Sequence, residues 1–292
     1  MNNTTKKYFI DKKITEQLME LIDSGELPWQ KPWNILCHKN LMANRFYRGL
    51  NPLILSMFNE RNDFNSTLWV TLKVAKKFDN CIKADQFKNP AYVYLFKFEE
   101  KEDDNGDKYT QPIFRYYRVW NIDQCKINED MQKLIDKRTP EKLEFNPIEK
   151  AEEFIKGYQD KPEVKHGGNR AFYMPTLDYV QLPPKKQFKS SEEYYSTKFH
   201  EFAHSTGHKN RLNRFNNEDK SIFKSESYSF EELIAEFTNA FCCSATGITN
   251  IIKNSAAYIQ SWKKALNDNP DWLRKAASKA HQAFDYMQGI RY

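Results

Sequence analysis

The sequence lacks several features that would assign it to a special structural class. It has 9 glycines and 12 prolines among 292 residues, too few for a collagen-like or linker-dominated chain. Its 5 cysteines show no Cys-x-x-Cys spacing, which argues against a disulfide framework and favours a reducing compartment. No apolar run reaches the roughly 18 residues of a membrane span, and no apolar signal segment begins the chain. We therefore expect a cytoplasmic protein without a membrane segment.

Aromatic residues and an uneven charge distribution are what the chain does have. Its 21 Phe, 16 Tyr and 6 Trp are ample for buried cores, which excludes general disorder. The net charge is +6, but many acidic residues of the first part lie in one run, Glu99 to Asp107. This run contains an Asn-Gly pair and is expected to form a solvated hairpin loop. Outside it the first part is basic, which is compatible with nucleic acid binding.

Hydrophobic periodicity predicts an α+β fold with two domains. In the first domain, residues 1–130, we expect helices over 8–24 and 51–61 and strands over 68–71, 91–98 and 113–120. The polar segment 126–147 contains two prolines and indicates the boundary. The second domain, residues 145–292, should begin with a helix over 147–158. Three short strands should then form a small sheet, and the chain from residue 190 onward should be mainly helical.

The strongest motif is HEFAH at residues 200–204, an HExxH pattern. Ser190 and Glu193 form a capping-box pattern, so a helix should begin just before the motif. Residues four apart lie on one face of a helix, so His200 and His204 can both bind one metal ion. Glu201 can then reach a metal-bound water and act as its general base. The motif therefore predicts a zinc centre of the zincin type, in which Zn²⁺ is the cofactor.

A catalytic zinc ion needs a third protein ligand. The metzincin spacing would put a histidine at position 210, where this chain has Asn210, so that form is not favoured. In the helix expected over 229–241, Glu231, Glu232 and Glu236 are the alternatives. Glu232 and Glu236 are four residues apart, so one can bind the ion while the other holds a ligand histidine from behind. We expect Glu232 to be the ligand and Glu236 the supporting residue, as in gluzincins.

Basic and aromatic residues alternate in the first domain, as they do in proteins that bind single-stranded DNA. The candidate DNA-binding residues are Trp29, Lys31, Trp33, Arg45, Tyr47, Arg48, Lys73, Lys76 and Arg118. The alternative for the aromatic members is an ordinary core position, because strand aromatics mostly pack inside proteins.

Several motifs, in order along almost the whole chain, resemble the ArdC-type antirestriction proteins, a family related to the N-terminal part of TraC-type plasmid primases. In the first domain they are LPWQKPW (27–33), NRFYRGLN (44–51), LWVTLKVA (68–75) and YRVWNIDQ (117–124). In the second they are AFYMPTLDYVQLP (171–183), HEFAHSTGHKNRLNR (200–214) and EELIAEF (231–237).

The resemblance implies a protein of a mobile element that protects incoming DNA from restriction. Its first domain would bind single-stranded DNA, and its second would be a zincin-like metallopeptidase domain. One alternative is a zinc peptidase that acts on a host protein and uses DNA only as a tether. Another is a DNA-binding protein without enzymatic activity, in which zinc is structural. The presence of Glu201 speaks against the last alternative, because a structural site does not need a general base.

Overall fold

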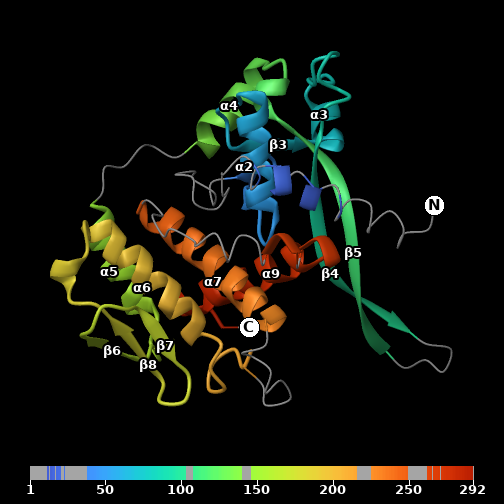
Figure 1. Ribbon diagram of the computed structural model, residues 1–292. Helices are drawn as coiled ribbons and strands as arrows, with labels where there is room; N and C mark the ends of the chain where they lie inside the picture. Colours follow the sequence, from blue (N-terminus) through green and yellow to red (C-terminus); the bar gives the residue numbers. More distant parts are fainter. Residues whose placement is uncertain are drawn as a thin grey trace. The chain divides into compact units, whose positions relative to one another are not determined.

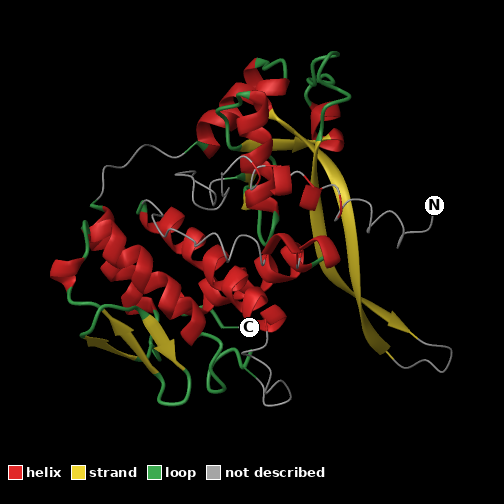
Figure 2. Ribbon diagram, viewed as in Figure 1, coloured by secondary structure: helices red, strands yellow, loops and turns green. Residues whose placement is uncertain are grey.

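The computed structural model describes residues 38–102, 108–139, 146–215, 225–248 and 271–291, with several positions of 12–23 and most of 262–269. It divides into two compact units, each containing helices and a sheet (Figures 1 and 2). The first unit spans residues 37–142. The second spans residues 143–292 and includes the described positions between 12 and 23. The α+β prediction is thus confirmed, whereas the contacts assign 12–23 to the unit opposite to the one expected.

A five-stranded sheet forms the centre of the first unit, with the strand order β2-β1-β3-β5-β4. The strands are β1 (Lys39–Asn40), β2 (Arg45–Phe46), β3 (Leu68–Thr71), β4 (Ala91–Glu102) and β5 (Lys108–Asn121). The β1 strand runs parallel to β3, and the other neighbouring pairs are antiparallel. Strands β2 and β4 therefore form the two edges of the sheet.

Helices pack against both faces of this sheet because alternate strand residues point to opposite sides. On one face, Trp69 and Val119 form a core with Leu55 of α2 (Asn51–Asn62). On the other face, Trp120 lies in a core with residues of α3 (Leu72–Lys77) and α4.

Helix α4 (Glu129–Arg138) lies within the segment that the sequence analysis assigned to the domain boundary. Its Met131 is fully buried against the first unit, and Leu134 and Ile135 pack partly against the same core. The segment is therefore in large part an element of the first unit, and one narrow apolar stripe is enough to dock an otherwise polar helix.

The hairpin of β4 and β5 is longer than predicted. Its pairing runs from Ala91 opposite Val119 to Glu102 opposite Lys108. The acidic run 99–107 was predicted to be a loop, but residues 99–102 belong to β4. The Asn-Gly turn expected at residues 105–106 lies outside the described residues.

Two buried polar side chains connect α2 and the sheet. Asn51 acts as a partner for the edge strand β4: its Oδ1 accepts from the Tyr94 backbone N–H at 2.7 Å, and its Nδ2 donates to the Tyr94 carbonyl at 2.9 Å. His38 accepts the Trp69 indole N–H on Nδ1 at 3.0 Å, and its Nε2 lies 2.9 Å from Ser56 Oγ. Burial lowers the pKa of His38 to about 3, so this imidazole is neutral and structural.

The second unit combines a small sheet with long helices. Strand β8 (Tyr179–Leu182) is the middle strand, parallel to β6 (Glu163–His166) and antiparallel to β7 (Phe172–Met174). The helices are α5 (Pro147–Gly157), α6 (Ser191–Ser205), α7 (Ser225–Thr246) and α9 (Trp272–Met287). This arrangement confirms the expected mainly helical domain with a small sheet. Of the helices described in either unit, none is both long and apolar enough to span a membrane.

Candidate functional site

Helix α6 presents both histidines of the HExxH motif on one face. The helix begins after Ser190, whose Oγ accepts a hydrogen bond from the Glu193 backbone N–H at 3.2 Å. His200 and His204 follow near the end of the helix, four residues apart, and their Nε2 atoms are 3.2 Å apart. The Ser190 cap fixes where the helix begins, and the four-residue spacing then places the Nε2 atoms of His200 and His204 next to each other.

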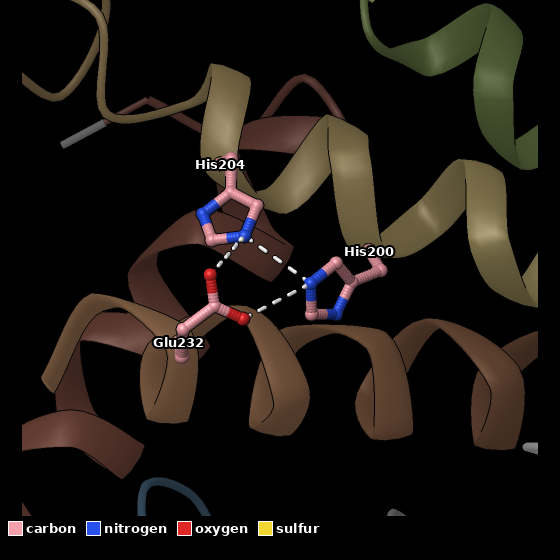
Figure 3. A group of neighbouring side chains, drawn as sticks. All are labelled: His200, His204 and Glu232. Carbon is pink, nitrogen blue, oxygen red and sulfur yellow. Dashed lines mark hydrogen bonds and ion pairs between the residues drawn. The ribbon is translucent and has the colours of Figure 1, made fainter. Parts of the chain in front are cut away.

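Glu232 of α7 completes a triangle of donor atoms with the two histidines (Figure 3). Its Oε2 lies 3.5 Å from His200 Nε2, and its Oε1 lies 3.4 Å from His204 Nε2. Ligand atoms around a tetrahedral ion with bonds of about 2.1 Å are about 3.4 Å apart. The nitrogen–nitrogen separation of 3.2 Å and the two nitrogen–oxygen separations, each to a different oxygen of Glu232, are close to that spacing. One ligand atom from each of the three residues lies within 4.8 Å of the other two. The donor set and its geometry therefore fit a divalent ion such as Zn²⁺.

Two further glutamates of α7 contact the outer nitrogens of the histidines. Glu236 Oε1 lies 3.3 Å from His200 Nδ1, and Glu231 Oε1 lies 3.5 Å from His204 Nδ1. A carboxylate in this position fixes the orientation of a ligand imidazole and increases its basicity. The sequence analysis expected this role for Glu236, whereas it considered Glu231 only as an alternative ligand.

Arg214 fixes Glu231 from the far side. Its Nη2 donates to Glu231 Oε1 at 2.7 Å and its Nε to Oε2 at 3.1 Å. The same guanidinium donates to Thr206 Oγ1 at 2.7 Å and to the Ala203 carbonyl at 2.9 Å, both at the end of α6. Arg214 thus connects the histidine helix to α7. The sequence analysis missed this role, because no spacing rule relates Arg214 to Glu231.

The site is strongly coupled electrostatically. Burial opposes a charge on His204, but Glu232 and Glu231 outweigh it and raise the pKa of His204 to about 9. Burial also opposes a charge on His200, and there Glu232 and Glu236 raise the pKa well above its usual value. Burial would raise the pKa of Glu232, but the two histidines bring it far below the usual range. The carboxylates around the histidines therefore favour positive charge at this point, which is the charge that a bound divalent cation supplies.

Glu201 lies beside the donor triangle and is not part of it. It is buried on α6, and burial raises its pKa, opposed by the nearby charges of His200 and His204. The backbone N–H of Tyr173 in β7 donates to its carboxylate, which limits the rise. A carboxylate with a raised pKa is a better proton acceptor near neutral pH than an exposed one.

The predicted DNA-binding residues fall into three groups. Trp29, Lys31 and Trp33 lie outside the described residues. The exposed candidates are Arg45, Arg48, Lys73, Lys76 and Arg118. Tyr47 is only 6% exposed and lies in the core with Leu55 and Trp69. Its ring cannot stack on a base, so the prediction is wrong for this residue. Tyr47 directly follows β2, and its side chain packs into the core of the first unit.

Two protein-family models match successive parts of the chain. Residues 9–120 match the N-terminal domain of the anti-restriction factor ArdC, and residues 149–279 match a zincin-like metallopeptidase. A DNA primase TraC of Escherichia coli is 32% identical over 94% of this chain, and a second one is 29% identical over 94%. The matched regions are 19% and 26% of those primases, so the chain spans about a fifth to a quarter of their length.

Two relatives match over almost their full lengths. The uncharacterized protein y4eC of Sinorhizobium fredii is 27% identical, over 95% of this chain and 91% of its own. The crystal structure of the antirestriction protein ArdC from plasmid R388 is similar in its metal-free form, with a TM-score of 0.74, 29% identity and coverage of 97% and 99% of the two chains. Its Mn(II)-bound form has a TM-score of 0.74 and 30% identity, over 95% of this chain and 96% of its own. With both family models matched and this similarity over nearly the entire chain, the protein belongs to the ArdC family of antirestriction proteins.

Proposed function

We propose that this protein binds single-stranded DNA with its first unit and holds a zinc ion in a peptidase-like centre in its second unit, and thereby protects incoming DNA from restriction. One observation carries the metal part of the proposal. The nitrogens of His200 and His204 and the carboxylate of Glu232 converge, with separations close to those between ligand atoms around a tetrahedral ion.

Zinc is the cofactor that the donor types favour. Two imidazole nitrogens and one carboxylate, with a fourth position left for water, are a common catalytic zinc set. The ArdC protein from R388 has been crystallised with Mn(II) bound, which supports binding of a divalent ion by the present protein. When bound, zinc lowers the pKa of its water ligand to about 7.

The residues around the donor triangle have separate tasks in this proposal. Glu236 and Glu231 orient the two histidines, and Arg214 holds Glu231 in place. Glu201 accepts the proton of the attacking water, for which its buried position and raised pKa are suited. A structural site would not need a carboxylate there, so Glu201 favours a catalytic centre.

The DNA part of the proposal rests on the match of residues 9–120 and on the exposed cations of the first unit. Arg45, Arg48, Lys73, Lys76 and Arg118 are available to phosphates. Contacts to phosphates carry little sequence information, so binding should be nearly independent of base sequence. It should weaken steeply as salt concentration rises, because each neutralised phosphate releases counterions.

The deciding experiment replaces Glu201 with glutamine, which keeps the shape of the side chain and removes the base. Metal content, thermal stability and DNA binding should stay near wild type, while any peptidase activity should fall by about 10²–10⁴-fold. The matched control is Glu192→Gln, at the start of the same helix. Protection of transferred DNA in a restricting host is then compared for all three proteins.

Each outcome assigns the mechanism differently. If Glu201→Gln protects as well as wild type, hydrolysis is not the protective step and DNA binding accounts for it. If protection disappears while metal and DNA binding persist, the peptidase acts on a host protein and DNA serves as a tether. A wild-type protein that retains no divalent ion after dialysis against low chelator concentrations would contradict the metal part.

A further inference from the structure

Strand β2, which follows a tight turn after β1, holds one aromatic ring in solvent. Phe46, the last residue of β2, is 55% exposed, more than any other phenylalanine among the described residues. Its neighbour Tyr47 is 6% exposed and points into the core. β2 is an edge strand, so on its outer side no further strand of the sheet covers it. An apolar ring held so far out of the core is a candidate contact surface.

The turn is internally hydrogen-bonded, so the position of the ring is preformed. Asn40 accepts a hydrogen bond from the Ala43 N–H on Oδ1 and from the Asn44 N–H on its carbonyl, both at 2.9 Å. Asn44 adopts a left-handed conformation with φ of 51°, which asparagine tolerates better than most residues. Lys39 and Phe46 are direct cross-strand partners.

Basic residues lie near Phe46, in space or along the chain. Lys39 Nζ lies 4.4 Å from the centre of the Phe46 ring. Arg45 and Arg48, one residue before and two residues after Phe46, are exposed. The sequence from His38 to Asn59 contains no aspartate or glutamate. Within the described part of the chain, neither Lys39 nor Arg45 pairs with a carboxylate. The surface therefore offers an apolar ring face together with the positive charges of Lys39 and Arg45, with which no carboxylate of the described residues pairs.

We propose that Phe46 is a base-stacking residue for single-stranded DNA and that Lys39, Arg45 and Arg48 contact the phosphates next to the stacked base. Single-strand binders combine these two elements: an aromatic platform that accepts any base, and cations that follow the backbone. This inference rests on the proposed DNA-binding function and adds the surface and the ring through which it acts.

The test measures binding of the full-length protein to a fluorescent oligothymidylate by anisotropy, over a series of salt concentrations. Phe46→Ala should weaken binding by about 5- to 160-fold without changing the slope of log K against log salt, because stacking releases no counterions. Phe46→Trp should restore affinity. Arg45→Ala should instead reduce the slope by about 0.7. The control is Leu95→Ala, an exposed apolar residue on β4 of the same sheet, 39% exposed.

The outcomes separate this inference from the function on which it rests. If the wild-type protein does not bind the oligonucleotide, the proposed DNA binding fails and the inference fails with it. If wild type binds and Phe46→Ala binds equally well, only the inference is overturned. Sedimentation without DNA tests the alternative that the ring contacts a second copy of this chain. If Phe46→Ala abolishes a dimer of the wild-type protein and leaves DNA affinity unchanged, the ring is a self-association contact and the inference is overturned.

Discussion

Replacing Glu236 with glutamine isolates the contribution of the charge behind His200. Glu236 is fully buried, and its Oε1 lies 3.3 Å from His200 Nδ1. Among the described residues, neither of its oxygens accepts a geometrically regular hydrogen bond. The carboxylate therefore acts mainly through its contact with the His200 imidazole. Glutamine keeps the size of the side chain and removes the charge that increases the basicity of that ring.

The expected size of the effect follows from mass action. Loss of a residue that orients a metal ligand weakens metal affinity by about 10–100-fold. With zinc at about 100 times the wild-type dissociation constant, binding stabilises the wild-type fold by about 2.7 kcal/mol. At the same zinc concentration, the gain is about 1.4 kcal/mol after a tenfold loss of affinity and about 0.4 kcal/mol after a hundredfold loss.

The assay compares urea unfolding with and without zinc for wild type and Glu236→Gln, together with competition against a chelating dye. Comparing the gain caused by zinc separates metal affinity from any change in the metal-free fold. Glu152→Gln is the control, because Glu152 accepts a hydrogen bond from Tyr195 in the same unit and does not contact the histidines. An equal zinc-induced gain in wild type and Glu236→Gln would refute the assigned role of Glu236.

Two predictions concern the first unit. The pKa of His38 is about 3 in the fold against 6.5 in the unfolded chain, so the unfolded state binds more protons between these values. Stability should fall as pH drops from 6.5, by at most about 1.4 kcal/mol per pH unit. His38→Gln should flatten this slope in urea midpoints, and parallel curves would disprove the reasoning. Asn51→Ala leaves two backbone groups of Tyr94 without their partner and should lower the free energy of unfolding by about 1–3 kcal/mol; an unchanged denaturation midpoint would contradict this.

Local patterns in the sequence were enough for the elements with strong periodicity or clear caps. The Asn-Pro start of α2, the Ser190 cap of α6 and the aromatic strands β4 and β5 all form near their predicted positions. Helix α4 was missed because its only fully buried side chain is Met131, too weak a stripe to stand out from charged neighbours. The length of the hairpin was missed because pairing between strands, and not apolarity, extends it.

The site divides in the same way. The proximity of His200 and His204 could be predicted because four-residue spacing on a helix fixes which side chains share a face. The tie from Arg214 to Glu231 could not, because it depends on how the segment after α6 folds back towards α7. The burial of Tyr47, next to the exposed Phe46, was also beyond local patterns. Which of two adjacent side chains faces the core is decided by the pairing of a two-residue strand with its neighbour.

The assignment of residues 12–23 to the second unit has a consequence for how the protein is made. Leu18 is fully buried, and Asp23 forms an ion pair with Lys263, far along the chain. During synthesis this segment leaves the ribosome before the first unit, while its packing partners, residues 143–292, leave after the first unit. The first unit, residues 37–142, is complete before residues 143–292 are made. It can therefore fold while residues 12–23 still lack their packing partners. A protein that began at residue 143 would therefore lack Leu18 and its neighbours, which belong to the core of the second unit.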